Sequence, residues 1–202
     1  MSEQVNECNS KSNQILFDVI IKEIDEENGF ISFDRFMELA LYHSKLGYYT
    51  KKNKRVGKDG DFITSVSIGK CYGTILARYF ESIIEDRFHK EKQIVIVEFG
   101  AENGDLALDV MTELKNILNK VLFKKIKYMV VEPFDSKRKE LALRLHSNGV
   151  ENYSIVPDLR NEKNLNGFVM GNEVLDAMPF RRVRMKNGKW VELGVGFKRS
   201  ED

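Results

Sequence analysis

The sequence has little cysteine or histidine, and each shortage excludes a class of protein. Its two cysteines, Cys8 and Cys71, lie far apart among 202 residues, one in a polar stretch and one in an apolar helical pattern. We therefore expect no disulfide framework and interpret the chain as cytoplasmic, where thiols stay reduced. The three histidines, His43, His89 and His146, do not have metal-ligand spacing with one another or with cysteine, so we expect no metal site.

An excess of one charge and a long hydrophobic run are also missing. Thirty-two Lys and Arg face 31 Asp and Glu, a net charge of +1, which gives no support for a nucleic-acid partner. The basic run at 51–58 is interpreted as a solvated loop, with a phosphate-binding patch as the alternative. No stretch is apolar enough to span a bilayer, and residues 1–13 lack the pattern of a secretory signal or a transit peptide. We expect neither nucleic acid nor membrane as a partner.

Apolar residues at helical spacing occupy the first part of the chain. We expect a disordered tail at 1–13 and a helical N-terminal segment at 14–90, with Ser32 as the N-cap of its second helix. The helices predicted from this spacing are 15–27, 33–43 and 70–88. The apolar face expected for the third helix consists of Ile75, Leu76, Tyr79, Phe80 and Ile83.

From residue 91 the pattern changes to short apolar runs that alternate with helical segments. The predicted strands are 94–99, 127–133, 153–156 and 167–172, and the predicted helices are 105–118 and 135–145. Such alternation requires right-handed crossovers and a parallel sheet. The fold class is therefore α/β, with a Rossmann-like core at 91–202. The pair Asn187-Gly188 suits a type I′ turn and predicts that this core ends in a β-hairpin.

Polar residues follow the first two predicted strands, where a Rossmann-like sheet binds its ligands. In the stretch EFGAENG, Gly100 can adopt a positive φ, and Gly104 lets the next helix start close to the strand. Exposed N–H groups at that helix start favour a carboxylate or a phosphate. Glu132, at the end of the second strand, can accept hydrogen bonds from both ribose hydroxyls. This pair predicts an adenosine site, for S-adenosylmethionine in preference to NAD, with a ligand-free turn as the alternative.

A third polar segment, GNEVLDAMPF, follows the fourth predicted strand. Asn172 and Glu173 leave the strand at its carboxyl end, and Asp176 comes one turn later. Methyl transfer needs an in-line approach of about 3 Å, and a guanidinium acceptor also needs a carboxylate to hold its planar fork. Glu173, with Asp176, is expected to supply it. The alternative is a helix N-cap at Asn172 followed by two solvated acids.

Four blocks of the sequence together resemble the MidA-like family of S-adenosylmethionine-dependent methyltransferases, which includes the mitochondrial complex I assembly methyltransferase. The blocks are ISFDRFMELALYHSKLGYY, GDFITS, EFGAENGDLALD with VEP, and NEVLDAMPF. The resemblance implies a class I methyltransferase fold, S-adenosyl-L-methionine as cofactor and a protein substrate, with arginine as the acceptor in the mitochondrial members. The residues it implies at the cofactor are Gly60, Asp61, Phe62 and Thr64 in a lid, Glu98, Gly100 and Gly104 at the methionine end, and Glu132 at the ribose. Those it implies at the acceptor are Asn172, Glu173 and Asp176.

The chain departs from the family pattern at three places. Glu102 replaces the middle glycine of E-x-G-x-G-x-G, and at about 4 Å from a bound carboxylate its charge would oppose binding by about 4 kcal/mol. Val66, Ser67 and Gly69 replace the residues expected after GDFIT. Family members also continue well past position 202, so we expect a sheet incomplete at its C-terminal side, with an open edge.

These departures leave other interpretations open. A homodimer, a partner chain or a natural truncation would each account for an open edge. The alternative to an active methyltransferase is a truncated, catalytically inactive homologue that acts as a binding or partner-dependent module. An NAD oxidoreductase is a third interpretation.

Overall fold

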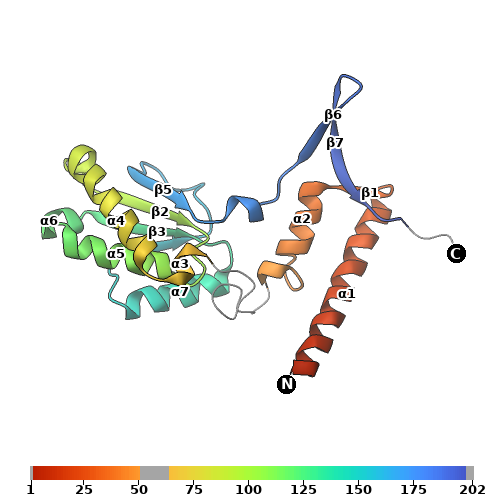
Figure 1. Cartoon of the computed structure of the whole chain (residues 1–202), viewed down its shortest axis with the longest axis horizontal. Coiled ribbons are helices and arrows are strands. Elements are labelled where there is room, and N and C mark those ends of the chain that lie inside the picture. Colours follow the sequence, from red (N-terminus) through yellow and green to blue (C-terminus); the bar gives the residue numbers. More distant parts are fainter. Residues whose placement is uncertain (1, 51–63, 199–202) are drawn as a thin grey trace. The chain divides into compact units, whose positions relative to one another are not determined.

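The computed structural model describes residues 2–50 and 64–198, with side chains described from Ser12 onward. Its residues fall into two compact units, and Figure 1 shows the elements of each. The sheet unit is Lys54–Leu175, and the helix–hairpin unit combines Met1–Asn53 with Asp176–Asp202. The expected boundary lay between residues 90 and 91, so the chain divides differently from the sequence-based expectation.

The sheet unit contains four parallel strands in the order β4-β3-β2-β5. They are β2 (Ile94–Phe99), β3 (Ile126–Val131), β4 (Tyr153–Val156) and β5 (Gly167–Gly171). β2 begins with four β-branched residues and β3 is apolar except for Lys127, and both are almost wholly buried, which suits strands that are covered on both faces. The predicted α/β class and its parallel sheet are confirmed.

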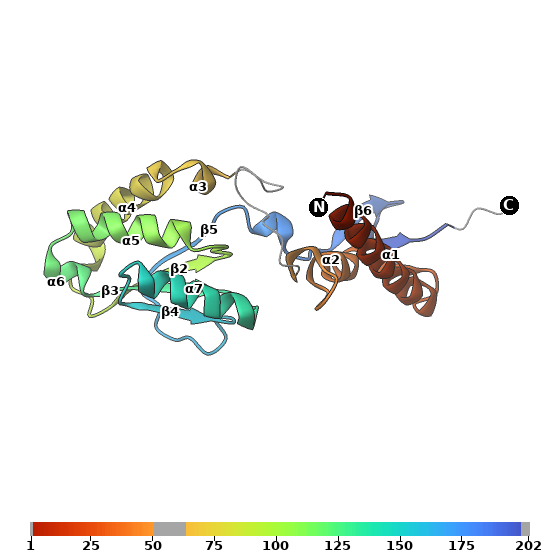
Figure 2. The same cartoon turned by 90° about the horizontal axis from the view of Figure 1, so that it is seen from below.

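Helices cover one face of this sheet, as Figure 2 shows for α4 and α5. The helices of the unit are α3 (Ser65–Ile68), α4 (Cys71–Ile83) with its π-helical extension η2 (Ile84–Phe88), α5 (Asp105–Ile117), α6 (Lys120–Phe123) and α7 (Asp135–Ser147). Ile96, Tyr128 and Leu145 lie in the core that these helices form with the sheet. On the opposite face, Leu159 and Leu165 from the β4–β5 connection pack against β2 and β3.

The inward face of α4 differs from the expected one. Ile75 and Tyr79 are mostly exposed, whereas Gly73 and Ala77 are buried. The reason is a close crossing of α4 over α5, because a Cβ added at Gly73 would lie only 2.5 Å from the Cβ of Asp109. Small residues allow this approach, and a prediction based on large apolar residues therefore selected part of the wrong face.

The helix–hairpin unit has its own small core. It contains α1 (Ser2–Glu26), β1 (Phe30–Ser32), α2 (Phe33–Tyr42), the short η1 (Tyr48–Thr50), β6 (Arg182–Lys186) and β7 (Lys189–Gly196), while η3 (Leu175–Ala177) crosses the unit boundary. The strands form an antiparallel sheet in the order β1-β7-β6. The predicted hairpin is confirmed, with positive φ at both Asn187 and Gly188. Ser32 occupies the predicted N-cap position of α2, but its side chain makes no capping hydrogen bond and its hydroxyl donates to Asp34 instead.

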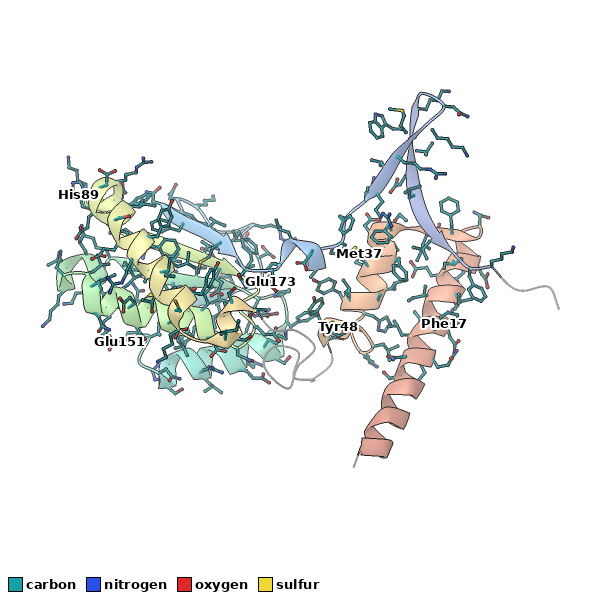
Figure 3. The ribbon with its side chains drawn as sticks, viewed as in Figure 1. Phe17, Met37, Tyr48, His89, Glu151 and Glu173 are labelled. Atoms are coloured by element: carbon teal, nitrogen blue, oxygen red, sulfur yellow. The ribbon has the colours of Figure 1, made fainter. Side chains whose placement is uncertain are left out.

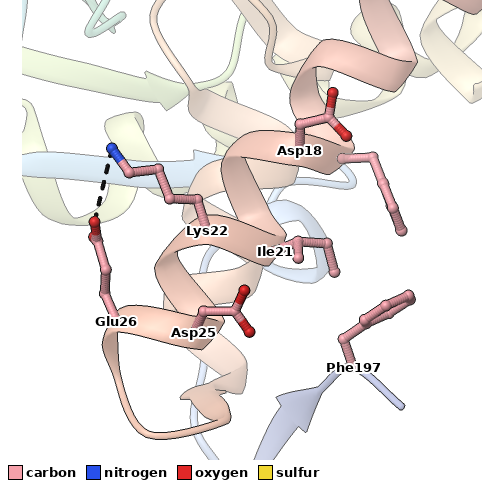
Figure 4. A pocket seen from close by; sticks show the side chains of 7 residues that line it. Asp18, Ile21, Lys22, Asp25, Glu26 and Phe197 are labelled. Carbon is pink, nitrogen blue, oxygen red and sulfur yellow. Dashed lines mark ion pairs between the residues drawn. The ribbon is translucent and has the colours of Figure 1, made fainter. Parts of the chain in front are cut away.

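Two expectations about this unit need correction. Residues 2–13 were expected to be disordered but belong to α1. The hairpin was assigned to the Rossmann-like core but pairs with β1, in the register Phe30↔Gly196. A three-residue strand such as β1 has no detectable period, so its distant partner could not be predicted. The segment after β7 also packs on α1: the rings of Phe17 and Phe197 are 5.6 Å apart beside a pocket of about 480 Å³ (Figure 4).

Candidate functional site

The loop after β2 has three alternate residues in the left-handed region of backbone conformation. φ is 67° at Gly100, 48° at Glu102 and 81° at Gly104. Gly104 is the N-cap of α5, and its N–H donates to the carbonyl of Ala101 over 2.6 Å. A Cβ at Gly104 would lie 3.1 Å from Leu141 of α7, so glycine allows the helices to approach. The tight turn leads the chain from the sheet directly into α5.

Glu98 is a buried carboxylic acid on β2, only 3% exposed. The hydroxyl of Tyr128, on the neighbouring strand β3, donates to its Oε2 over 2.6 Å. Burial raises the pKa of Glu98 to about 7, although the Tyr128 hydrogen bond acts in the opposite direction. No described residue donates a hydrogen bond to the other oxygen, Oε1. The carboxyl group is thus held at one oxygen and available at the other.

Glu132 is the second buried acid of this region, directly after β3. The backbone N–H of Phe134 donates to its Oε1 over 2.9 Å. Burial raises the pKa of Glu132, and the Phe134 N–H and the charge of Lys137 partly offset that effect. Within the described part of the chain, Oε2 receives no hydrogen bond. Glu98 and Glu132 therefore follow one pattern: one oxygen is fixed by the protein and the other is free to accept.

Lys137 was not predicted from the sequence, and it explains how Glu102 is accommodated. Its Nζ lies 3.4 Å from Oε2 of Glu102, and it also lies over the ring of Phe134 at 5.8 Å from the centroid. The positive charge offsets the carboxylate that was expected to oppose a bound anion. The sequence places Lys137 in the first turn of the helix after β3, but nothing in it shows that this side chain reaches Glu102 in the loop after β2.

The segment after β5 lies against the glycine loop. A Cβ at Gly100 would be 2.8 Å from Cγ2 of Val174, so only glycine fits there. Phe99 of β2 is paired with Gly171 of β5, which places the following residues at the same edge as Glu98. Asn172 is half-buried, and Glu173, labelled in Figure 3, is exposed with a φ of 52°. A short 3-10 helix, Leu175–Ala177, follows, so Asn172 does not cap an α-helix, but Glu173 and Asp176 are both exposed, as the alternative of two solvated acids expects.

The structure does not test the place of the other predicted site residues at this edge. Asp176 belongs to the helix–hairpin unit, and Gly60, Asp61 and Phe62 lie outside the described residues. Thr64 is the N-cap of α3: its Oγ1 accepts from the N–H of Ser67 over 3.2 Å, and its own N–H donates to Oγ of Ser67 over 2.9 Å. Ser67, a departure from the family pattern, thereby completes a capping box.

The described residues include neither a metal-binding cluster nor a membrane-spanning helix. Among them, no group of three or more His, Cys, Asp or Glu residues is arranged to hold a metal ion. None of the helices described has both the length and the apolar character needed to cross a membrane.

A glycine loop after one parallel strand and a buried acid after the next define the chain as a Rossmann-like α/β protein. A model of a family described as S-adenosyl-L-methionine-dependent methyltransferases matches residues 75–202. The chain belongs to this family, and the resemblance found in the sequence is confirmed.

Solved structures and curated proteins agree with this assignment. A COG1565 superfamily protein from Burkholderia thailandensis, bound to S-adenosyl-homocysteine, has a TM-score of 0.70 at 24% identity and covers 96% of this chain and 52% of its own. This likeness shows the fold. The chain is also 25% identical over 199 residues to the Caenorhabditis elegans homolog of the mitochondrial protein arginine methyltransferase NDUFAF7, and 24% identical over 182 residues to that of Drosophila melanogaster.

Coverage of these relatives is partial. The alignments include 87% and 82% of this chain but only 45% and 41% of the two relatives. The chain therefore spans less than half the length of the curated proteins that it matches. Their names also contradict the expectation of a cytoplasmic protein, because all of these relatives are mitochondrial. A low cysteine count does not distinguish the cytoplasm from other reducing compartments, which explains the error.

Proposed function

We propose that this chain binds S-adenosyl-L-methionine and transfers its methyl group to a protein, with an arginine side chain as the acceptor. Family membership supports the cofactor and the reaction, and the names of the curated relatives support the acceptor. One observation carries the proposal: Glu98 and Glu132 are buried at the ends of neighbouring strands, and each keeps one carboxylate oxygen free. A nonfunctional turn would not require two buried acids.

Each end of the cofactor has a suitable partner at this edge. The methionine ammonium would bind the free oxygen of Glu98, and its charge would draw the pKa of that carboxyl back toward the ordinary range. The ribose hydroxyls would donate to Oε2 of Glu132. Glycine at 100 and 104 lets the loop pack closely against Val174 and Leu141, and this tight loop leaves the N–H groups at the start of α5 for the methionine carboxylate. We keep the lid residues Gly60, Asp61, Phe62 and Thr64 as part of this proposal.

The acceptor would bind at the segment after β5. A guanidinium nitrogen attacks the methyl carbon, the carbon–sulfur bond breaks, S-adenosyl-homocysteine leaves, and the nitrogen loses one proton. Glu173 is proposed to hold the guanidinium in place and to take up that proton, with Asn172 and Asp176 as further acceptor contacts. The positive φ of Glu173 supports a positioned side chain, because non-glycine residues in that conformation gather at functional sites.

Calorimetric titration with S-adenosyl-L-methionine tests the cofactor site. Glu132→Gln should weaken binding at least tenfold, because an amide accepts hydrogen bonds less strongly than a carboxylate. Glu151→Gln, which changes an exposed acid before β4, is the matched control and should bind like the parent chain. Equal affinity in Glu132→Gln and the parent chain would remove the ribose assignment.

Transfer of a labelled methyl group to an arginine-containing protein tests the acceptor site. Glu173→Gln should retain cofactor affinity and lose transfer, whereas undiminished turnover would exclude Glu173 from the mechanism. Cofactor binding by the parent chain without transfer to any acceptor would instead support the inactive binding module.

We further propose that another polypeptide, either a second copy or a partner chain, covers the outer edge of β5. Among the described strands β5 pairs only with β2, and Val169 on β5 is 67% exposed. Exposed apolar edges promote strand pairing. Sedimentation velocity should show an assembly that Val169→Lys disrupts. A monomer at all concentrations, without any co-purified partner, would contradict this proposal.

A further inference from the structure

The hairpin of β6 and β7 is anchored at its base. Arg181 pairs with Asp34 of α2 at 3.3 Å and with Glu192 of β7 at 3.7 Å. The guanidinium of Arg182 lies over the ring of Phe33, 4.9 Å from its centroid. These contacts fix the start of β6 against α2, so the far half of the hairpin is presented in a defined orientation.

One face of the far half carries three exposed apolar side chains, with Glu192, which pairs with Arg181, at its base. Met185 is paired with Trp190 and Val183 with Glu192, and paired residues share a face of the sheet. Val183, Met185 and Trp190 are 57%, 52% and 69% exposed. Three adjacent exposed apolar side chains, one of them a tryptophan, are characteristic of an interaction surface.

The opposite face of the far half is cationic. Arg184 shares it with Val191, and Lys186 with Lys189. Within the described part of the chain these three cations have no ion pair and no hydrogen bond, and no acid occurs between Asp176 and Glu192. Their charge is therefore available to a negatively charged partner.

β6 is the last strand of its sheet, so its outer backbone groups have no strand partner among the described residues. We propose that this edge binds an extended acidic protein segment as an additional strand. Acidic residues at alternate positions of the segment would face Arg184 and Lys186, and apolar residues between them would cover Val183, Met185 and Trp190. Strand addition of this kind takes affinity from backbone hydrogen bonds and specificity from the alternate side chains.

A protein segment fits this surface better than a nucleic acid or an anionic membrane does. The net charge of +1 provides no broad positive field, which both of those polyanions require. Half of the surface is apolar, and a strand edge offers amide groups in a pattern that only another peptide backbone matches. The proposal does not depend on the methyltransferase assignment.

Fluorescence anisotropy of the 202-residue chain with three labelled peptides tests the proposal. One peptide alternates Asp with Val and Ile over ten residues, the second has the same composition with all acids in one block, and the third repeats the first with alternate backbone nitrogens methylated. The alternating peptide should bind at least tenfold more tightly than the other two, and less tightly as salt is added. Equal binding of all three, or no binding, would overturn the proposal.

Variants locate the binding to the hairpin. Arg184→Glu combined with Lys186→Glu should weaken binding at least tenfold, and Trp190→Ser should do so independently of salt. Lys45→Glu, an exposed charge elsewhere in the same unit, is the control and should leave binding unchanged. Circular dichroism and thermal melting confirm that each variant is folded. Tighter binding to single-stranded RNA or to phosphatidylserine vesicles than to the alternating peptide would refute the choice of a protein partner. Self-association of the chain that these variants abolish would also refute it.

Discussion

Replacing Glu98 by glutamine tests the buried carboxyl group at the edge of the sheet. The change keeps the size of the side chain and an oxygen that accepts the Tyr128 hydrogen bond, but it removes the group that titrates. The folded chain holds the Glu98 pKa at about 7, above the ordinary value of 4.5, because burial disfavours the charged form. The variant should therefore alter how the free energy of unfolding depends on pH.

The sign of the effect follows from proton binding. Between about pH 4.5 and 7 the folded state keeps a proton on Glu98 that the unfolded state has lost, so this group lowers stability as the pH rises through that window. A pKa displaced from 4.5 to about 7 corresponds to about 3 kcal/mol, which is fully expressed above pH 7. The buried amide of the variant has its own desolvation cost, but that cost does not change with pH.

Urea denaturation of the parent chain and of Glu98→Gln at pH 4.5 and pH 8 measures this quantity. The stability of the variant relative to the parent should rise by about 3 kcal/mol from pH 4.5 to pH 8. Other titrating groups are common to both proteins and cancel, and Glu151→Gln should show no such rise. A relative stability that is flat across this range would refute the assignment of a protonated, buried Glu98. If Glu98 has its proposed function, the same variant should bind the cofactor ammonium poorly. Glu98→Gln would then raise the free energy of unfolding and weaken cofactor binding at the same time.

Two further predictions concern the loop beside Glu98. Lys137→Met removes the ammonium that lies 3.4 Å from Glu102. Because both side chains are partly solvated, the lost interaction should be worth about 1 kcal/mol, which calorimetry would measure as a roughly fivefold weaker cofactor affinity. Lys139→Met, which changes an exposed lysine on the same helix, should leave the affinity unchanged, and equal weakening in the two variants would contradict the pairing. Gly100→Ala should lower the free energy of unfolding by about 1–3 kcal/mol more than Gly188→Ala, because both have positive φ but only the first meets an atom within 3 Å. Equal chemical-denaturation midpoints would show that the loop relaxes around the methyl group.

The sheet and its edge could be predicted because their signals are local. The continuous apolar runs of β2 and β3 leave few alternatives to buried parallel strands, and an acid placed directly after such a strand must lie at its carboxyl end. The positions of Glu98, Gly100 and Glu132 at this edge were therefore predictable, and their role in an adenosine-type site stays a prediction. Asn187-Gly188 specified the hairpin turn for the same reason.

What could not be predicted depends on contacts between distant residues. The pairing of β1 with β7 joins segments that have no common sequence pattern. The inward face of α4 depends on how closely α5 approaches Gly73. The direction of the Glu102 side chain depends on a lysine 35 residues further along. In each case the sequence lists the partners but does not show that they meet.

The pairing of Phe30 with Gly196 also has a consequence for the order in which the chain folds. In the sequence, the residues of the sheet unit come between the two segments of the helix–hairpin unit, so all strands of the sheet unit are synthesised before β7. During synthesis the sheet unit can therefore begin to fold before α1 and α2 have β7 to pack against. The first helices made are thus the last to be stabilised, and they remain open to chaperones or proteases until β7 has left the ribosome.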